Sequence, residues 1–518
     1  MAGFNISELK FLHIDDFGSY RSMLKSILSS IGIVHMDDAK DAIDAMEKIK
    51  RQNYDVILCD YNLGDGQNGQ QFLEEAMSRQ LLPYGTIFIM ITAENTADMV
   101  MAAVEYRPDA YLSKPFPKEI LINRLEKLIT KKEAFKAIYT AYNKKDYEQA
   151  INLCDQSMEK NPKLTVDIGK LKAEIAIKSK EFDLAESIYD KALSIRPFDW
   201  AQFGKGKVCF KKGDDLQAQK ILENLIKQNK NYIEAYDILS LIYKNNKDME
   251  KAQEILQTAT KISPRAISRQ QHLSQIAVEN GDFKVAEKSL RSSIGLGKHS
   301  YLGKIEDHTD LTKLYIESGN TSKAVKVLNN AKKQYKKDSQ SIFHTDVVDG
   351  MIQFKQGHEE KSREIFEKVI HSMPDDIHNL PKSLQDDIIA NGELLNETEM
   401  VESLKEDIQN PGALSTDDRA DKKNKYKYLL INGKGMREYK KQRIAAASKL
   451  FEQAAENLPD NISVNMNAAQ TFIMFIKEST NSNPDIKQKI RHYLDISKQL
   501  DSHNEKYKKL EELYTGLK

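Results

Sequence analysis

The chain has 518 residues, too many for a single hydrophobic core, so at least two domains are expected. Its net charge is zero, but residues 1–130 carry 13 Lys and Arg against 19 Asp and Glu, whereas residues 131–518 carry 64 against 58. No segment is basic enough for a nucleic-acid-binding patch, and no apolar run approaches the roughly 20 residues of a membrane span.

The cysteines and the N-terminus bear on location. The three cysteines are scattered without a C-x-x-C pair, which argues against a zinc site or a disulfide framework. The N-terminus shows no basic region followed by a long apolar stretch, so no signal peptide is expected. Both features predict a protein of the reducing cytoplasm.

Strand-like apolar runs alternate with amphipathic helical patterns over the first 130 residues. The predicted strands are 11–14, 33–36, 55–59, 86–92 and 110–114. The predicted helices are 19–32, 39–52, 69–80, 95–106 and 117–129. This alternation predicts a doubly wound, five-stranded parallel sheet with helices on both faces.

Polar residues follow four of the predicted strands at their carboxyl ends. These residues are Asp15, Asp16, Asp60, Thr92 and Lys114. Each could by itself be a helix cap or a turn residue. In a parallel sheet, however, these ends meet at one edge, where open α/β proteins form their sites. Clustered carboxylates favour Mg²⁺, and with a hydroxyl and an ammonium they suit an aspartate that accepts a phosphoryl group.

Residues 10–130 resemble the receiver domain of bacterial response regulators. The matching segments are FLHIDDFGSYR, VILCDYNLGDG, MITAE and AYLSKPF. The resemblance implies a flavodoxin-like fold in which Asp60 is the phosphoacceptor. It also implies that Asp15, Asp16, Asp60 and the backbone carbonyl of Asn62 hold Mg²⁺.

The same resemblance implies further roles for five residues. Thr92 and Lys114 would bind the phosphoryl group, and Tyr111 would be an aromatic switch. Asn62 and Glu94 would flank the path of the water that removes the phosphoryl group, a pairing that resembles chemotaxis-type regulators with a short-lived signal. The chain departs from many receivers at Leu63-Gly64, where Met-Pro is usual, and its GDGQNG loop is one residue longer.

A helical pattern with a period near 34 residues replaces the strands after residue 130. A small residue recurs at Ala150, Ala185, Ala218, Ala252, Ala286 and Ala324. The intervals are 35, 33, 34, 34 and 38 residues. Each unit has a polar turn, the small residue, a bulky apolar residue four positions later and often a closing proline, which predicts a helical hairpin. These features resemble tetratricopeptide repeats, which stack into protein-binding solenoids.

The expected array covers residues 131–518 with about eight units and an irregular region at 375–427. Within that region, residues 409–425 read as a polar loop or hinge. Residues 484–515 are expected to form helices that cap the array. Residues 118–147 contain neither Gly nor Pro, so one helix could continue from receiver to array. A capping box at residues 130–133 could instead start a new helix at Thr130.

Together, the two resemblances predict a cytoplasmic two-component response regulator. A sensor histidine kinase would phosphorylate Asp60, and the phosphoryl group would control protein–protein interactions of the array; neither nucleic acid nor membrane is an expected partner. One alternative is a constitutive repeat scaffold with a silent receiver. Another is an aspartate-nucleophile phosphatase, which is disfavoured because Asn62 replaces the second aspartate of a D-x-D pattern. No enzyme activity is expected beyond the receiver's own phosphoryl transfer and autodephosphorylation.

Overall fold

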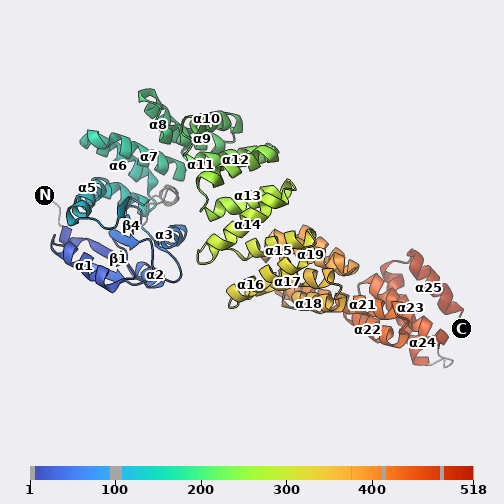
Figure 1. Ribbon diagram of the computed structural model, residues 1–518. Helices are drawn as coiled ribbons and strands as arrows, with labels where there is room; N and C mark the ends of the chain where they lie inside the picture. The colour runs from blue at the N-terminus through green and yellow to red at the C-terminus, as the bar shows by residue number, and fades with distance from the viewer. Residues whose placement is uncertain (1–5, 94–107, 375, 411–415, 479–483, 517–518) are drawn as a thin grey trace. The chain divides into compact units, whose positions relative to one another are not determined.

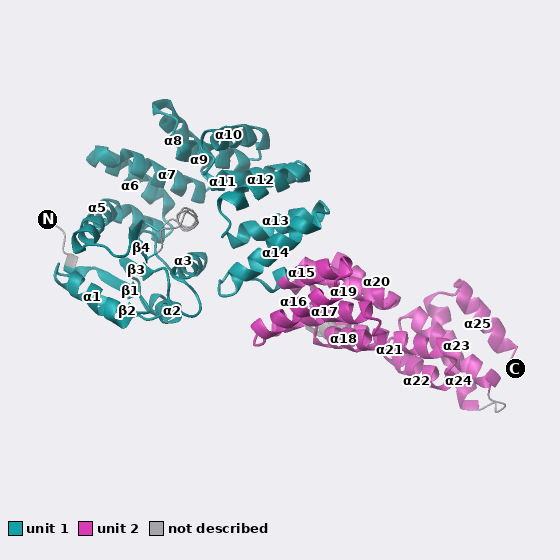
Figure 2. Cartoon of the chain, viewed as in Figure 1, with its two compact units in different colours: residues 1–307 teal, residues 308–518 magenta. Residues whose placement is uncertain are grey.

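The computed structural model describes residues 6–93, 108–374, 376–410, 416–478 and 484–516. A five-stranded parallel sheet is followed by a long run of helices (Figure 1). The chain forms two compact units, residues 1–307 and 308–518 (Figure 2). Within the described ranges, no helix has both the length and the apolar character needed to cross a membrane.

The sheet has the predicted doubly wound topology. Its strands are β1 (Lys10–Ile14), β2 (His35–Ala39), β3 (Val56–Asp60), β4 (Ile87–Thr92) and β5 (Ala110–Ser113). They are parallel and lie in the order β2-β1-β3-β4-β5. The order reverses beside β1, so the carboxyl ends of β1 and β3 border the crevice in which such sheets place their sites.

Helices cover both faces of this sheet. They are α1 (Gly18–Ser29), α2 (Ala42–Arg51), α3 (Gly69–Ser78) and α5 (Lys118–Asn143). Because side chains alternate along a strand, Val56 and Leu58 of β3 pack with α1 and α5, whereas Ile57 and Cys59 pack with α2 and α3. Every residue of β3 is buried, which explains the unbroken apolar run before Asp60.

Two predicted elements need comment. The strand predicted at 33–36 lies two residues later, at His35–Ala39. It is an edge strand whose residues stay largely half-exposed, so it includes Asp37 and Asp38 and carries no apolar run. The helix predicted at 95–106 lies outside the described residues.

Helix α5 carries the chain from the sheet into the repeats without interruption. Its residues Leu121 and Leu125 belong to the core of the sheet, and Phe135 and Ile138 belong to the core of the first repeat. Thr130 lies inside α5 and does not begin a new helix, and its hydroxyl donates to the carbonyl of Glu126 one turn earlier instead of capping. Of the two alternatives for the junction, the structure has the continuous helix.

Helical hairpins follow α5 in the first unit. They are α6 (Tyr147–Lys160), α7 (Thr165–Lys178), α8 (Phe182–Ile195), α9 (Asp199–Lys211), α10 (Asp215–Gln228), α11 (Ile233–Asn245), α12 (Met249–Ile262), α13 (Ile267–Glu279), α14 (Phe283–Gly297) and the start of α15 (Ile305–Glu317). Two short helices also belong to this unit: η1 (Ile6–Glu8), before β1, and η2 (Pro162–Leu164), between α6 and α7. The unit therefore joins the sheet to the first repeats, whereas the expected domain boundary lies at 130/131.

The second unit is also built from helices. They are α16 (Thr321–Gln334), α17 (Ser339–Lys355), α18 (Glu359–Ser372), η3 (Ile377–Asn379), α19 (Lys382–Leu394), α20 (Thr398–Gln409), α21 (Thr416–Lys440), α22 (Ile444–Asn457), α23 (Ile462–Glu478), α24 (Pro484–Leu500) and α25 (Glu505–Thr515). The region 375–427 contains η3, α19, α20 and the start of α21, and part of the polar loop or hinge expected at 409–425 is helical instead. Residues 416–425 belong to α21, whose charged sequence TDDRADKKNK lacks the apolar periodicity that marks a helix.

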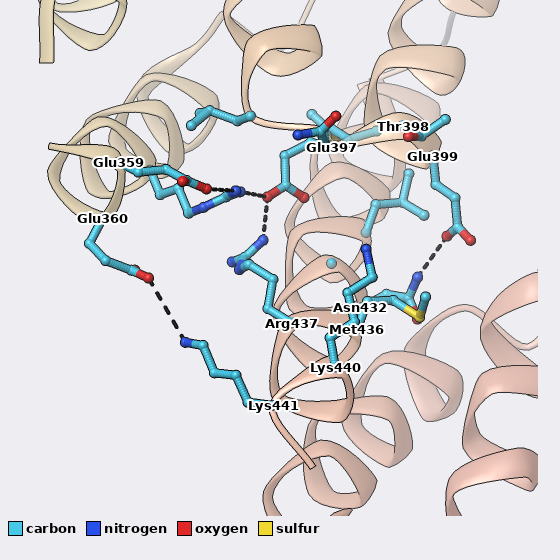
Figure 3. A pocket seen from close by; sticks show the side chains of 16 residues that line it. Glu359, Glu360, Glu397, Thr398, Glu399, Asn432, Met436, Arg437, Lys440 and Lys441 are labelled. Carbon is cyan, nitrogen blue, oxygen red and sulfur yellow. Dashed lines mark hydrogen bonds and ion pairs between the residues drawn. The ribbon is translucent and has the colours of Figure 1, made fainter. Parts of the chain in front are cut away.

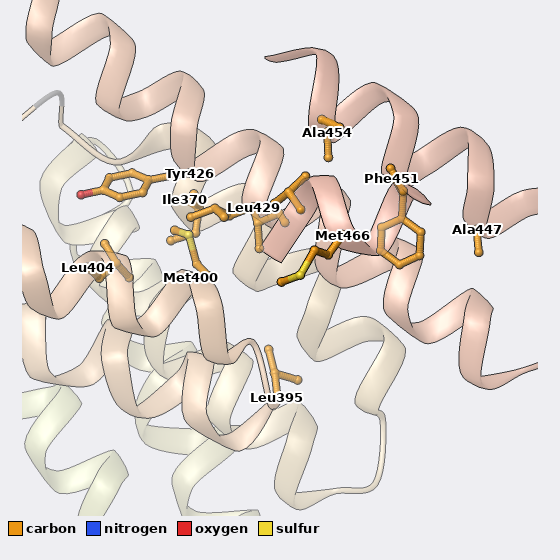
Figure 4. Packing of buried hydrophobic residues seen from close by; sticks show 14 of the residues in the cluster. Ile370, Leu395, Met400, Leu404, Tyr426, Leu429, Ala447, Phe451, Ala454 and Met466 are labelled. Atoms are coloured by element: carbon orange, nitrogen blue, oxygen red, sulfur yellow. The ribbon is translucent and has the colours of Figure 1, made fainter. Parts of the chain in front are cut away.

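The recurring alanines hold the hairpins together. All six are fully buried, each in an even-numbered helix from α6 to α16. A small side chain lets the paired helices approach closely, as the period predicted. Later in the sequence, Phe451 and Ala454 of α22 lie in one hydrophobic core with Leu429 of α21 and Met466 of α23 (Figure 4).

Candidate functional site

The carboxyl ends of four strands bring the predicted polar residues together. Asp60 is the last residue of β3 and pairs in register with Ile91 of β4. Asp15 and Asp16 directly follow β1, Thr92 ends β4, and Lys114 directly follows β5. A pocket of about 370 Å³ at this edge is lined by Asp60, Thr92 and Lys114 together with Asn62.

The lysine links two of the carboxylates. Lys114 Nζ lies 2.9 Å from Asp15 Oδ2 and 2.8 Å from Asp60 Oδ2. Asp15 is fully buried and Asp60 is 6% exposed, so the ammonium of Lys114 helps to offset the cost of burying both carboxylate charges. The backbone N–H of Lys114 donates to the carbonyl of Thr92 at 2.7 Å, which fixes the lysine beside the end of β4.

The start of α1 positions Asp15. The backbone N–H of Phe17 donates to Asp15 Oδ1 at 2.9 Å, and Arg21 Nη1 donates to the Asp15 carbonyl at 2.6 Å. Lys114 Nζ lies 3.9 Å from the centre of the Tyr20 ring, a cation–π contact. Phe17, Tyr20 and Arg21 were not identified from the sequence, since a single helical turn with an aromatic and a basic residue is an ordinary pattern.

Burial sets the electrostatics of the site. It raises the pKa of Asp60, and the nearby Asp15 carboxylate adds to the rise, while the hydrogen bond and charge of Lys114 oppose it. Burial alone would lower the pKa of Lys114, but its bonds to Asp60 and Asp15 outweigh that effect and raise the pKa. The ammonium of Lys114 therefore faces an Asp60 carboxylate whose charged form is still disfavoured by burial, and a second cation would stabilise that charge.

The donor set of the site fits a hard divalent cation. Oxygen atoms of Asp15, Asp16 and Asp60 lie within 4.8 Å of one another. Asp16 Oδ1 is buried and has no hydrogen-bond partner in the described part of the chain. Carboxylate oxygens are the ligands that Mg²⁺ prefers, so these three residues form a group that suits it.

Of three further predicted residues, the structure describes Asn62 and Tyr111. Asn62 lines the pocket, and its Oδ1 also accepts from the N–H of Gly64 at 3.3 Å, so the side chain shapes the turn as well. Tyr111 is half-buried against the layer of α2 and α3, and burial raises its pKa. Glu94 lies outside the described residues.

A glycine that the sequence did not single out brings α3 close to the site. A Cβ on Gly69 would lie 2.1 Å from the carbonyl oxygen of Asp60, so no other residue fits without a backbone shift. The N–H of Gly69 donates to the carbonyl of Tyr61 at 2.8 Å. Asn68 and Gln71 close a capping box at the start of α3. The Asn68-Gly69 dipeptide before an apolar run was the available signal.

A second pocket, of about 700 Å³, lies in the second unit between α18, α20 and α21 (Figure 3). Glu397 Oε1 accepts from Arg363 at 2.7 Å and also from Arg437. The lining contains four acidic and four basic residues: Glu359, Glu360, Glu397, Glu399, Arg363, Arg437, Lys440 and Lys441. Because the buried charges pair with each other and the lining is neutral, this network is best explained as a link between the three helices.

Comparison with known proteins matches both parts of the chain. A model of the response regulator receiver domain matches residues 11–126, and a tetratricopeptide repeat model matches residues 171–199 and 233–265. The chemotaxis protein CheY of Pseudomonas aeruginosa is 28% identical over 120 residues, which cover 23% of this chain and 95% of the relative. The chemotaxis protein CheY-3 of Vibrio cholerae is also 28% identical over 120 residues, which cover 23% of this chain and 91% of that protein.

Solved structures resemble the same two parts. The chemotaxis protein CheY4 of Vibrio cholerae has 26% identity and a TM-score of 0.22, with 23% of this chain and 98% of that chain covered. A tetratricopeptide repeat protein from Parabacteroides merdae has 16% identity and a TM-score of 0.31, with 51% and 96% covered. The sequence matches show that the chain has an N-terminal response regulator receiver domain. Repeats of the tetratricopeptide type follow it.

Proposed function

We propose that this protein is a two-component response regulator in which phosphorylation of Asp60 controls the protein–protein interactions of the repeat array. The observation that carries the proposal is the contact of Lys114 Nζ with both Asp15 and Asp60 at the carboxyl edge of the sheet. The similarity of this domain to chemotaxis proteins named CheY supports the same class of chemistry.

The proposed reaction is the transfer of a phosphoryl group from a phosphohistidine of a sensor kinase. A carboxylate oxygen of Asp60 attacks phosphorus, the N–P bond breaks, and its electron pair stays on the imidazole. Lys114, already 2.8 Å from Asp60, neutralises the transferred group, and the hydroxyl of Thr92 donates a hydrogen bond to it. Asp15, Asp16, Asp60 and the Asn62 carbonyl would hold Mg²⁺, which when bound neutralises charge on the phosphoryl oxygens.

The proposed output is a change in what the array binds. Repeat solenoids present extended surfaces to other proteins, and the continuous helix α5 gives the receiver a stiff connection to the first hairpin. No catalytic role is assigned to the array. We place the protein in the cytoplasm, where a sensor kinase can reach Asp60.

Labelling with a small phosphodonor tests the proposed site. The full chain is treated with acetyl phosphate and Mg²⁺, and the base-labile phosphoryl group is counted by mass. Asp60→Asn is expected to abolish the label, and Asp65→Asn, a change at an exposed aspartate of the same loop, is expected to keep it. A label that persists on Asp60→Asn would place the acceptor elsewhere.

A further inference from the structure

The repeat array also contacts the receiver at a place far in sequence from α5. Ser300 Oγ donates to Glu74 Oε2 of α3 at 2.6 Å, and Gln71 Nε2 donates to the carbonyl of Leu296 at 3.1 Å. The guanidinium of Arg79 lies 4.8 Å from the centre of the Tyr301 ring. The end of α14 thus lies beside α3 (Figure 1). Glu74 is only 4% exposed, so this contact is partly closed to water.

Another contact involves Tyr61, the residue after Asp60. Arg265, between α12 and α13, donates from Nη1 to the phenolic oxygen of Tyr61 at 2.7 Å. The N–H of Tyr61 donates to the carbonyl of Ile91 in β4, and its carbonyl accepts from Gly69 at the start of α3. The array therefore contacts a residue that is held between Asp60 and the helix that carries the other contacts.

The repeat period explains where these contacts come from. The interval from Ala286 to Ala324 is 38 residues, four more than the usual 34. In the structure, residues 298–304 separate α14 from α15, whereas residues 263–266 separate α12 from α13. Ser300 and Tyr301 lie in this longer connection. The irregular interval of the array thus coincides with the segment that contacts the receiver.

The longer connection is compact. The N–H of Ser300 donates to the carbonyl of Gly297, and the N–H of Gly303 donates to the carbonyl of Ser300. A Cβ on Gly303 would lie 2.2 Å from the Gly297 carbonyl oxygen, so glycine is needed where the loop closes. The N–H of Leu302 donates to Ser300 Oγ at 3.0 Å, which orients the hydroxyl toward Glu74.

We propose that residues 298–303, here called the docking loop, act together with Arg265 as an intramolecular docking site for α3, and that phosphorylation of Asp60 weakens this docking. The second part rests on the proposed function. The docked contacts are made while Lys114 is bonded to Asp60. Tyr61 lies between Asp60 and Asn62 in the sequence. A phosphoryl group on Asp60, together with a shift of Asn62, therefore displaces the phenol of Tyr61 from Arg265.

The coupling must act in both directions. If phosphorylation weakens docking, docking disfavours phosphorylation by the same free energy, because linked equilibria are reciprocal. Chains that cannot dock should therefore carry more phosphoryl group at a given phosphodonor concentration. Release would also free Glu74 and the docking loop for contact with another protein.

Hydrogen exchange of the full chain, without phosphodonor, tests docking by itself. The double change Arg265→Ala and Ser300→Ala is expected to raise amide exchange several-fold in residues 296–303 and 69–79, while β1 and β3 stay protected and report an intact fold. Glu74→Gln, which keeps the size of the side chain, is expected to raise exchange in the same two segments. Arg291→Ala is the control, because this exposed arginine of α14 pairs only with Glu287 in the described contacts. Unchanged exchange in both test variants would overturn the docking site.

A second arm adds acetyl phosphate and Mg²⁺ to test the coupling. In the native chain, exchange of residues 296–303 is expected to rise, and in Asp60→Asn it is expected to stay constant. The double variant is expected to carry several-fold more label at Asp60 than the native chain. No change, or slower exchange, in a native chain that is labelled at Asp60 would overturn the coupling. Absence of label from the native chain would instead overturn the proposed function, and the coupling with it, while the first arm still decides docking.

Discussion

The ammonium nitrogen of Lys114 lies 2.8 Å from Oδ2 of Asp60, and the lysine side chain is 17% exposed. The same nitrogen also serves Asp15, at 2.9 Å. One lysine therefore balances two buried carboxylates, which makes it a structural counter-charge for both.

Replacing this lysine should destabilise the receiver. Lys114→Met removes the ammonium that donates to both Asp15 and Asp60, so the opening free energy of β1 and β3 is expected to fall by about 1–3 kcal/mol in Mg²⁺-free buffer. Added Mg²⁺ should restore part of the loss. Amide exchange of the two strands measures it, with the exposed Lys118→Met as control. Native-like protection in Lys114→Met would show that the contact contributes little.

The lifetime of the phosphoryl group should depend on Asn62 and Glu94. Both side chains are polar enough to admit and orient a water molecule opposite the Asp60 oxygen, so we expect fast release of phosphate from the labelled native chain. Asn62→Leu with Glu94→Leu should lengthen the lifetime. Phosphate release after removal of the phosphodonor decides the point: slow native decay, or a variant that decays at the native rate, would contradict the assignment.

The arrangement of the site was predictable because it follows from strand order. In a parallel sheet, residues at the carboxyl end of each strand reach one edge, so the sequence alone groups Asp15, Asp60, Thr92 and Lys114. The sharing of Lys114 between two carboxylates could not be predicted, since it depends on side-chain direction and burial.

In the repeats, too, features that follow from nearby residues can be predicted from the sequence, whereas contacts between distant residues cannot. The sequence predicts the buried alanines because each follows the repeat period. It does not decide whether α5 is one helix or two, because Thr130 suits both a helix cap and a helix interior. The contacts of Arg265 and Ser300 with the receiver join residues more than 200 positions apart. The 38-residue interval from Ala286 to Ala324 marks an insertion that contains Ser300 without indicating what it contacts, and no irregularity of the period marks Arg265.

Close helix packing in the array should make one glycine irreplaceable and another dispensable. A Cβ on Gly204 of α9 would lie 2.2 Å from Cζ of Tyr189, which is 4% exposed, so Gly204→Ala should destabilise the first unit by about 1–3 kcal/mol. A Cβ on Gly295 of α14 meets nothing within 4 Å, so Gly295→Ala should stabilise by up to about 1 kcal/mol. Thermal unfolding of the full chain measures both. Equal shifts for the two variants would contradict the packing argument.

Acid should destabilise the second unit through His308. The ring is 3% exposed, its Nδ1 has no partner among the described residues, and burial lowers its pKa from 6.5 to about 4. The unfolded chain therefore binds the proton first, so stability is complete above pH 6.5 and falls as pH drops toward 4. The expected slope is about 1.4 kcal/mol per pH unit within that window.

His308→Phe should remove this part of the pH dependence, because phenylalanine keeps the edge contact with Tyr335 and cannot take up a proton. Amide exchange of α15 and α16 between pH 4 and 7 measures the slope. His503→Gln, at an exposed histidine, should keep the native slope. An unchanged slope in His308→Phe would assign the acid sensitivity to other groups.

In the proposed function, the phosphorylation state of Asp60 sets the affinity of the array for a protein partner. A partner captured from cell extract on the immobilised full chain is purified, and its dissociation constant is measured for the native chain with and without acetyl phosphate and Mg²⁺, and for Asp60→Asn. Allosteric coupling is typically about 1–3 kcal/mol, so a several-fold change is expected in the native chain and none in Asp60→Asn. Identical affinities for the labelled and unlabelled native chain would contradict the account and leave a constitutive scaffold.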